Sequence, residues 1–189
     1  PVYRCARIPH DFADEAHAAP EERIAALDGF DAALDSIAAG TVPATAPFPE
    51  IAAAVARHRM ALTPFRDLLS AFRQDVTTTR YATEALLFDY CRRSANPIGR
   101  LMLRIFDADT PANVGASDAI CTALQLINFW QDIAVDWAKG RVYLPLEHLE
   151  RFDVTEAHIA EARCDDLWRA LMNFDLGPTA SPPEGGRAR

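Results

Sequence analysis

Four polar side chains recur at helical spacing in the second half of the chain. Wound on a helix over residues 118–138, they fall within an arc of about 80°: Gln125, Asn128, Asp132 and Asp136. The rest of that helix surface is almost entirely apolar, so we expect the helix to be buried. Ionised carboxylates in a dry core are very costly, so these should face cations, water or a ligand-filled cavity.

The two carboxylates have a spacing that suits a divalent cation. Asp132 and Asp136 lie about one helical turn apart, so both can hold Mg²⁺ while the ion keeps positions for phosphate oxygens. The ion would neutralise charge on a departing diphosphate, and Lys139 and Arg141 just past the helix could contact its oxygens. A lone D-x-x-x-D is most simply a solvated helix face. The apolar surroundings favour the metal site here.

Two segments carry a resemblance to a known family. The pattern Q-x-x-N-x-x-x-D-x-x-x-D followed by K-G-R-V-Y-L-P, within LQLINFWQDIAVDWAKGRVYLP, resembles the second aspartate-rich motif of the squalene and phytoene synthases. Upstream, YCRRSANPIGRL at 90–101 resembles that family's segment at the hydrophobic prenyl channel. Its S-A-N-P form is similar to the hydroxysqualene-forming branch of bacterial hopanoid synthesis. The resemblance spans roughly residues 2–173 and implies an all-α, isoprenoid synthase-type helical bundle around a central cavity.

The resemblance implies roles for individual residues. Those implied as catalytic, with the amides and the tyrosine orienting a cation or water, are Tyr90, Gln125, Asn128, Asp132 and Asp136. Those implied in substrate binding are Tyr3, Arg7, Ile98, Gly99, Cys121, Lys139, Arg141 and Tyr143. For the channel residues taken singly, simple packing between helices is an equally good interpretation.

Residues 3–15, YRCARIPHDFADE, resemble the family's first aspartate-rich motif. Tyr3, Arg7 and Asp14 match it, and Asp11 stands beside the position of its first aspartate, so Asp11 and Asp14 complete the implied metal ligands. That position itself holds His10, a poor ligand for Mg²⁺, and Pro9 interrupts the expected helix. The resemblance therefore supports the second motif more strongly than the first.

The implied reaction is Mg²⁺-dependent ionisation of presqualene diphosphate, followed by water capture to give hydroxysqualene. One alternative is the head-to-head condensation of two farnesyl or geranylgeranyl diphosphates, as in presqualene or phytoene synthase. Another class is an inactive helical remnant, which the residues at positions 9 and 10 and the abrupt tail favour. Contact with neighbouring pathway enzymes and peripheral contact with a membrane are left open.

Helices are expected throughout, and no sheet, because Ala, Leu, Arg and Glu are abundant and β-branched runs are short. We predict them over 3–16, 21–39, 50–60, from about 63 onward, 83–106, 118–138 and 155–172. Pro97 should break or kink the fifth of these, and Gly140 should end the sixth at its C′ position. Residues 143–145 are predicted to form a turn.

Composition bounds the remaining possibilities. The net charge of −8 argues against a nucleic-acid partner. The four cysteines form no C-x-x-C pair, so no zinc site or disulfide framework is indicated, and the cytoplasm is the expected compartment. No stretch approaches the length of a membrane span. We expect one helical domain over 1–176, truncated at both ends relative to the family, and a disordered tail over 177–189 rich in Pro and Gly.

Two further groups of polar residues are given only structural roles. His58, His148 and His158 stand alone and are interpreted as surface residues. Asp75, Arg80 and Tyr81 fall at a helix end, where capping and solvation are favoured over substrate contact.

Overall fold

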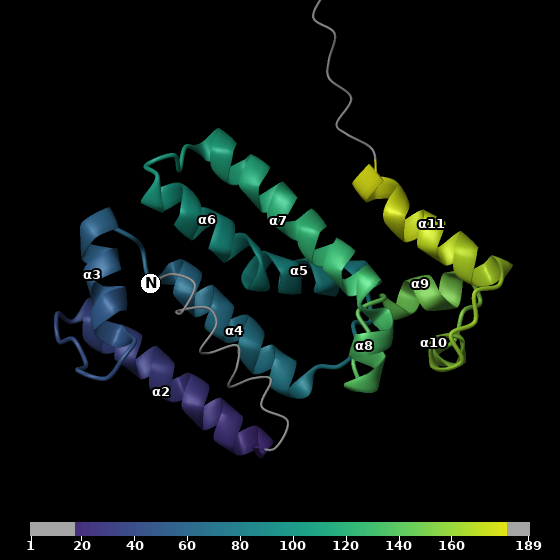
Figure 1. Ribbon diagram of the computed structural model, residues 1–189, viewed down its shortest axis with the longest axis horizontal. Helices are drawn as coiled ribbons and strands as arrows, with labels where there is room; N and C mark the ends of the chain where they lie inside the picture. The colour runs from purple at the N-terminus through teal and green to yellow at the C-terminus, as the bar shows by residue number, and fades with distance from the viewer. Residues whose placement is uncertain (1–17, 181–189) are drawn as a thin grey trace, which may run out of the picture. The chain divides into compact units, whose positions relative to one another are not determined.

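The computed structural model describes residues 18–180, which form helices and connecting loops without a strand (Figure 1). The chain divides into two compact units. The first unit comprises the described part of Pro1–Thr78 together with Phe88–Gln125, and the second comprises Thr79–Leu87 and the described part of Leu126–Arg189. The all-α prediction is confirmed, while a single domain over 1–176 stays a prediction.

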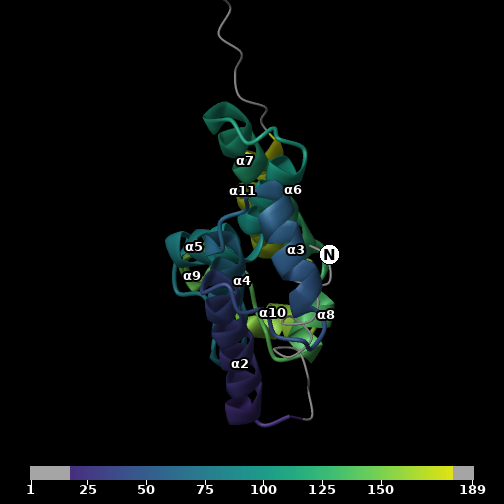
Figure 2. The ribbon, with the colours of Figure 1, turned by 90° about the vertical axis from the view of Figure 1, so that its left-hand side faces the viewer.

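The first unit is built on three amphipathic helices: α2 (Pro20–Ala38), α3 (Phe48–His58) and α4 (Thr63–Thr77). Pro20 and two glutamates open α2, and the backbone N–H of Ala19 donates to the Glu22 carboxylate at 3.1 Å. Helix α4 runs alongside α2 (Figure 1, Figure 2). Its predicted apolar stripe is buried and forms the core of this unit with residues of α2 and α3: Phe65, Leu68, Leu69 and Phe72.

Pro97 divides the predicted helix over 83–106 into α5 (Glu84–Ser94) and α6 (Asn96–Ile105). The break at Ala95 is the one expected, because Pro97 lacks an N–H and clashes with the preceding turn. Helix α7 (Pro111–Gln131) begins earlier than predicted. Thr110 caps it, accepting from the Asn113 N–H at 3.3 Å, with proline at the first helical position.

The second unit contains three short helices, α8 (Ile133–Ala138), α9 (Leu146–Arg151) and α10 (Glu156–Ala160), and the longer α11 (Asp166–Ala180). Residues 79–82 bind the loop after α8 through their backbone, since Thr79 and Tyr81 accept from the N–H groups of Val142 (3.0 Å) and Leu146 (2.9 Å). An apolar core lies among these elements: Val142, Leu144, Leu149, Val154, Ile159 and Leu171.

Two predicted boundaries in the second unit were wrong. The expected helix over 155–172 is interrupted between α10 and α11, where Asp165 accepts from the backbone N–H of Trp168 at 3.0 Å and so starts a new helix. Helix α11 continues to Ala180, so residues 177–180 are helical rather than part of the tail. Residues 181–189 lie outside the described residues.

Within residues 18–180, none of the helices combines the length and the apolar character needed to span a bilayer.

Candidate active site

The second aspartate-rich motif lies where α7 passes into α8. Asp132 adopts φ −97° and ψ 13° and separates the two helices, so the predicted continuous helix over 118–138 is bent at this residue. Helical hydrogen bonds nevertheless run through the bend, from the Asp132 N–H to the Asn128 carbonyl (2.9 Å) and from the Asp136 N–H to the Asp132 carbonyl (2.8 Å). The predicted one-turn spacing of Asn128, Asp132 and Asp136 is therefore retained.

The expected burial of this helix was wrong. Asn128 and Asp132 are exposed, and even the apolar Val135 is 55% exposed. Asp136 alone among the three polar residues is half-buried. Because the Asp132 carboxylate stays hydrated, the desolvation cost expected for a buried carboxylate in this motif does not arise there.

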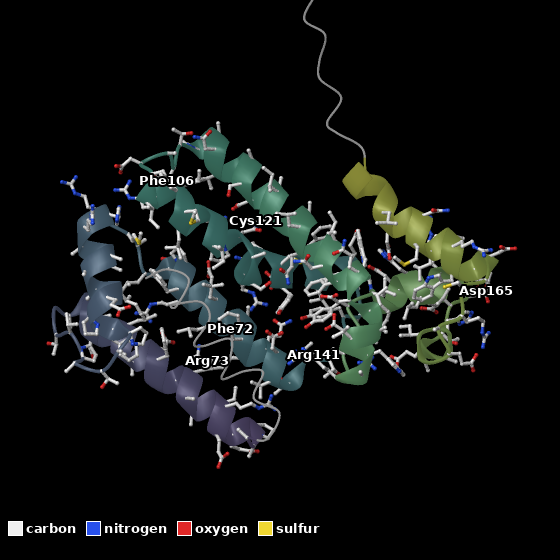
Figure 3. All side chains as sticks on the ribbon, in the orientation of Figure 1. Phe72, Arg73, Phe106, Cys121, Arg141 and Asp165 are labelled. Carbon is white, nitrogen blue, oxygen red and sulfur yellow. The ribbon has the colours of Figure 1, made fainter. Side chains whose placement is uncertain are left out.

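The chain turns at Gly140 after α8, as the sequence predicted. Gly140 has φ 76°, its N–H donates to the Trp137 carbonyl at 2.9 Å, and the Arg141 N–H donates to the Asp136 carbonyl at 2.8 Å. This pair of bonds defines a Schellman motif with Gly140 at C′. It turns the chain so that Lys139 and Arg141 directly follow the turn that carries Asp136, and Figure 3 labels Arg141 in this loop.

Asp136 and Arg141 line a small hollow in the second unit, together with Phe129, Ile133, Val142, Tyr143 and Leu144. Tyr143, a predicted substrate-binding residue, stacks on Phe129 with ring centres 3.8 Å apart and on Tyr81 at 5.8 Å. Phe129 and Tyr143 thus form an aromatic wall of the hollow beside Asp136 and Arg141. The hollow has room for about one water molecule, so a prenyl chain does not fit inside it.

Asp132 and Asp136 offer carboxylate oxygens one helical turn apart, which is the ligand type that Mg²⁺ prefers. Magnesium commonly binds through one or two carboxylates and completes its six oxygen ligands with water and substrate phosphates. Within residues 18–180, no cluster of three or more His, Cys, Asp or Glu side chains is placed to hold a metal. The predicted remaining ligands, Asp11 and Asp14, lie outside the described residues, as do Tyr3 and Arg7.

Two of the predicted channel residues of the first unit, Gly99 and Cys121, lie where α6 meets α7. A Cβ on Gly99 would lie 2.2 Å from Ser117 Oγ and 2.7 Å from Cys121 Sγ, so the two helices approach closely there. Ile98 packs against the core of this unit, and Figure 3 labels Cys121 on α7. These contacts are those of helix packing, and the predicted channel role of these positions stays a prediction.

Tyr90 is anchored by a buried acid in the first unit. Its hydroxyl donates to Asp75 Oδ2 at 2.9 Å, and the two residues are 4% and 8% exposed. The expectation that Asp75 and Tyr81 are solvated was therefore wrong, since Tyr81 is 2% exposed. Gln125, on α7, is half-buried.

Two histidines assigned to the surface are buried in the second unit. His148 contacts Asp175 through Nδ1 and Oδ1 at 2.7 Å, and burial raises the pKa of the Asp175 carboxyl despite the opposing effect of His148. His158 Nδ1 accepts from the backbone N–H of Thr155 at 3.1 Å, which makes a capping box at the start of α10. The capping role of His158 was not predicted, because histidine is not a usual capping-box residue. The contact of His148 was not predicted, because its partner Asp175 lies 27 positions away in the sequence.

Arg80 was also missed as a link between distant segments. Its guanidinium binds both carboxylate oxygens of Glu156, at 2.6 and 3.0 Å, and donates to the carbonyls of Thr79 (2.8 Å) and Gly140 (2.6 Å). The hydrogen bond with Glu156 raises the pKa of Arg80 and lowers the pKa of Glu156. The partners are 76 positions apart, so no local pattern could reveal the pair.

Comparison with known proteins identifies the family. The family model for squalene/phytoene synthase matches residues 2–177. The chain is 38% identical over 148 residues to a hydroxysqualene synthase of Sinorhizobium fredii, covering 78% of this chain and 49% of that protein. It is 30% identical over 187 residues to a 15-cis-phytoene synthase of Synechococcus elongatus, covering 93% of this chain and 60% of that protein. The chain thus spans about half to three-fifths of the length of these relatives.

A solved structure shows the same fold. The crystal structure of the squalene synthase HpnC from Alicyclobacillus acidocaldarius superposes with a TM-score of 0.87 at 36% identity, over 94% of this chain and 66% of that one. This likeness confirms the predicted isoprenoid synthase-type helical fold. With the family match over nearly all of the described residues, the chain belongs to the squalene/phytoene synthase family.

Proposed function

We propose that this chain carries the second aspartate-rich half of a Mg²⁺-dependent site that ionises a prenyl diphosphate. The observation that supports the proposal most directly is the arrangement at the end of α8. Asp132 and Asp136 stand one turn apart, and the chain turns back so that Arg141 lines the same hollow as Asp136. Two carboxylates for a metal and a guanidinium for phosphate oxygens are thus held by α8 and the residues at its two ends.

The residues divide the work of ionisation between them. Asp132 and Asp136 would hold Mg²⁺, which would supply neutralisation of the negative charge that develops as the diphosphate leaves. Arg141 and Lys139 would bind diphosphate oxygens by charge-assisted hydrogen bonds. Asp75 holds Tyr90, the proposed cation- or water-orienting group, by accepting a hydrogen bond from its hydroxyl at 2.9 Å.

The reaction proposed is conversion of presqualene diphosphate to hydroxysqualene. The C–O bond to diphosphate breaks, the cation rearranges, and a water oxygen adds to carbon and loses a proton. The S-A-N-P sequence at 94–97 and relatives named hydroxysqualene synthase, at 38% and 34% identity, support this choice. The second candidate is head-to-head condensation, supported by the phytoene synthase that aligns with 93% of the chain.

The test is to incubate the purified chain with Mg²⁺ and either presqualene diphosphate or farnesyl diphosphate. Hydroxysqualene from the former supports the proposal, and turnover of farnesyl diphosphate alone supports the condensing enzyme instead. The absence of both turnover and binding, for either diphosphate, would identify the chain as an inactive remnant.

The metal-binding role is tested by Asp132→Asn and Asp136→Asn, which preserve side-chain size. Each should lower kcat/KM by about two orders of magnitude, because several kcal/mol of charge stabilisation is lost with the ion. Asp153→Asn is the matched control, since Asp153 is exposed in the same unit and its positive φ of 54° suits asparagine. Equal activities of all three variants would contradict the assignment.

A further inference from the structure

The guanidinium of Arg80 joins three separate stretches of the second unit. Four hydrogen bonds use most of its five N–H donors: two reach Glu156 at the start of α10, one reaches Thr79, and one reaches Gly140 after α8. The guanidinium carbon also lies 5.7 Å from the ring centre of Trp137, within cation–π range. Arg80 therefore contacts α8 and the loop that follows it from one side.

The bond to Gly140 acts on the loop that carries the proposed phosphate-binding residues. From the α8 side, the Schellman bonds tie the N–H groups of Gly140 and Arg141 back to the helix. From the other side, Arg80 holds the Gly140 carbonyl at 2.6 Å, and Thr79 holds the N–H of Val142 at 3.0 Å. The backbone from 139 to 142 is thus fixed by partners on both sides.

We propose that Arg80, oriented by Glu156, is a positioning residue that fixes the loop 139–142 so that Arg141 and Asp136 meet the diphosphate together. The inference rests on the proposed function, because it assigns a role to residues around that site. Arg80 does not need to touch the substrate, since its donors are directed at Glu156 and at two backbone carbonyls.

The chemistry of the site requires arginine rather than any cation. A planar guanidinium can bind a carboxylate through two parallel N–H groups and still present another N–H to Gly140, whereas a lysine ammonium is a point charge. Arg80→Lys therefore keeps the charge beside Glu156 and removes the geometry. Glu156→Gln leaves the arginine unchanged and removes the negative charge and one of the two acceptor oxygens that orient it.

The experiment measures the dissociation constant of inorganic pyrophosphate in saturating Mg²⁺, together with KM and kcat for the prenyl diphosphate. Arg80→Lys and Glu156→Gln should each weaken pyrophosphate binding about tenfold, the loss expected for one misplaced charge-assisted hydrogen bond. KM should rise more than kcat falls. Amide hydrogen exchange should be faster in the peptide spanning the loop than in the rest of the chain, whereas general destabilisation would raise exchange throughout.

Matched controls come from the other end of α10. Glu161 follows that helix and pairs with Arg163 on the surface, without contact to the loop. Glu161→Gln and Arg163→Lys make the same chemical changes and should leave pyrophosphate binding within about twofold of the wild type.

The outcomes distinguish a failure of this inference from a failure of the proposed function on which it rests. If the wild-type chain binds pyrophosphate and the Arg80 and Glu156 variants behave like the controls, the positioning role is overturned and the proposed function stands. A wild-type chain that binds no pyrophosphate overturns both. The double variant should bind pyrophosphate at most about twofold more weakly than the weaker of the two single variants, because both changes act through one contact. Fully additive losses of binding would refute that route. If Arg80→Lys does not fold, Glu156→Gln decides the question.

Discussion

Replacing Gly99 by alanine tests the close approach of α6 and α7. The new methyl group would lie 2.2 Å from Ser117 Oγ and 2.7 Å from Cys121 Sγ, both well inside van der Waals contact. Either the two side chains change rotamer or the helices separate. Overpacking of this kind costs about 1–3 kcal/mol.

An opposing effect must be subtracted from that cost. Alanine is favoured over glycine inside a helix by roughly 1 kcal/mol, so Gly99→Ala alone should lower the free energy of unfolding by about 1 kcal/mol. The close atoms are removed in the double variant Ser117→Ala, Cys121→Ala, where the nearest remaining contact is Ser117 Cβ at 3.6 Å. In that background Gly99→Ala should instead stabilise the protein by about 0.5–1 kcal/mol.

Urea denaturation of the four proteins at 25 °C measures both differences. The effect of Gly99→Ala should differ between the two backgrounds by about 1–3 kcal/mol, with a change of sign. An identical effect in both backgrounds would show that Ser117 and Cys121 do not restrict position 99, and the packing interpretation would be lost.

Two further predictions concern buried ionisable groups. Burial raises the pKa of the Cys91 thiol to about 12, so iodoacetamide at pH 8 should modify exposed Cys164 and spare Cys91 in the native protein, as measured by mass spectrometry. Labelling of both at similar rates would contradict the burial of Cys91. The raised pKa of Asp175 means that folding loses stability as pH rises from about 3.9, its unfolded value, through the folded value. Asp175→Asn keeps the acceptor for His148, so its Tm should exceed that of the wild type at pH 7, with the excess shrinking toward pH 4; a pH-independent difference would refute this.

The helix boundaries that proved predictable are those marked by proline and glycine. Pro97 ended α5 and Gly140 ended α8 because each residue has a fixed backbone consequence. The bend at Asp132 has no such marker. Thr110-Pro111 is a cap signal of the same kind, yet the predicted helix began only at residue 118, where Asp118 instead binds Arg100 at 2.6 Å.

The candidate site was predictable only as far as local spacing reaches. The one-turn relation of Asp132 to Asp136 and the position of Arg141 after the turn follow from helical periodicity and the glycine cap. The exposure of Asp132 and the contact between Arg80 and Glu156 depend on which segments meet in three dimensions. Tertiary contacts of this kind cannot be read directly from a single sequence.

The second unit is assembled from two pieces of chain, and this has a consequence for how it folds. Thr79–Leu87 must find the loop after α8 across the intervening Phe88–Gln125, which belongs to the first unit. Closing a flexible loop of about 40 residues costs roughly 3 kcal/mol in chain entropy, and ordering that stretch beforehand changes the cost. The loop that follows Asp136 thus gains its contacts with Thr79 and Arg80 only after this long-range closure, so during synthesis these contacts should be among the later ones to form.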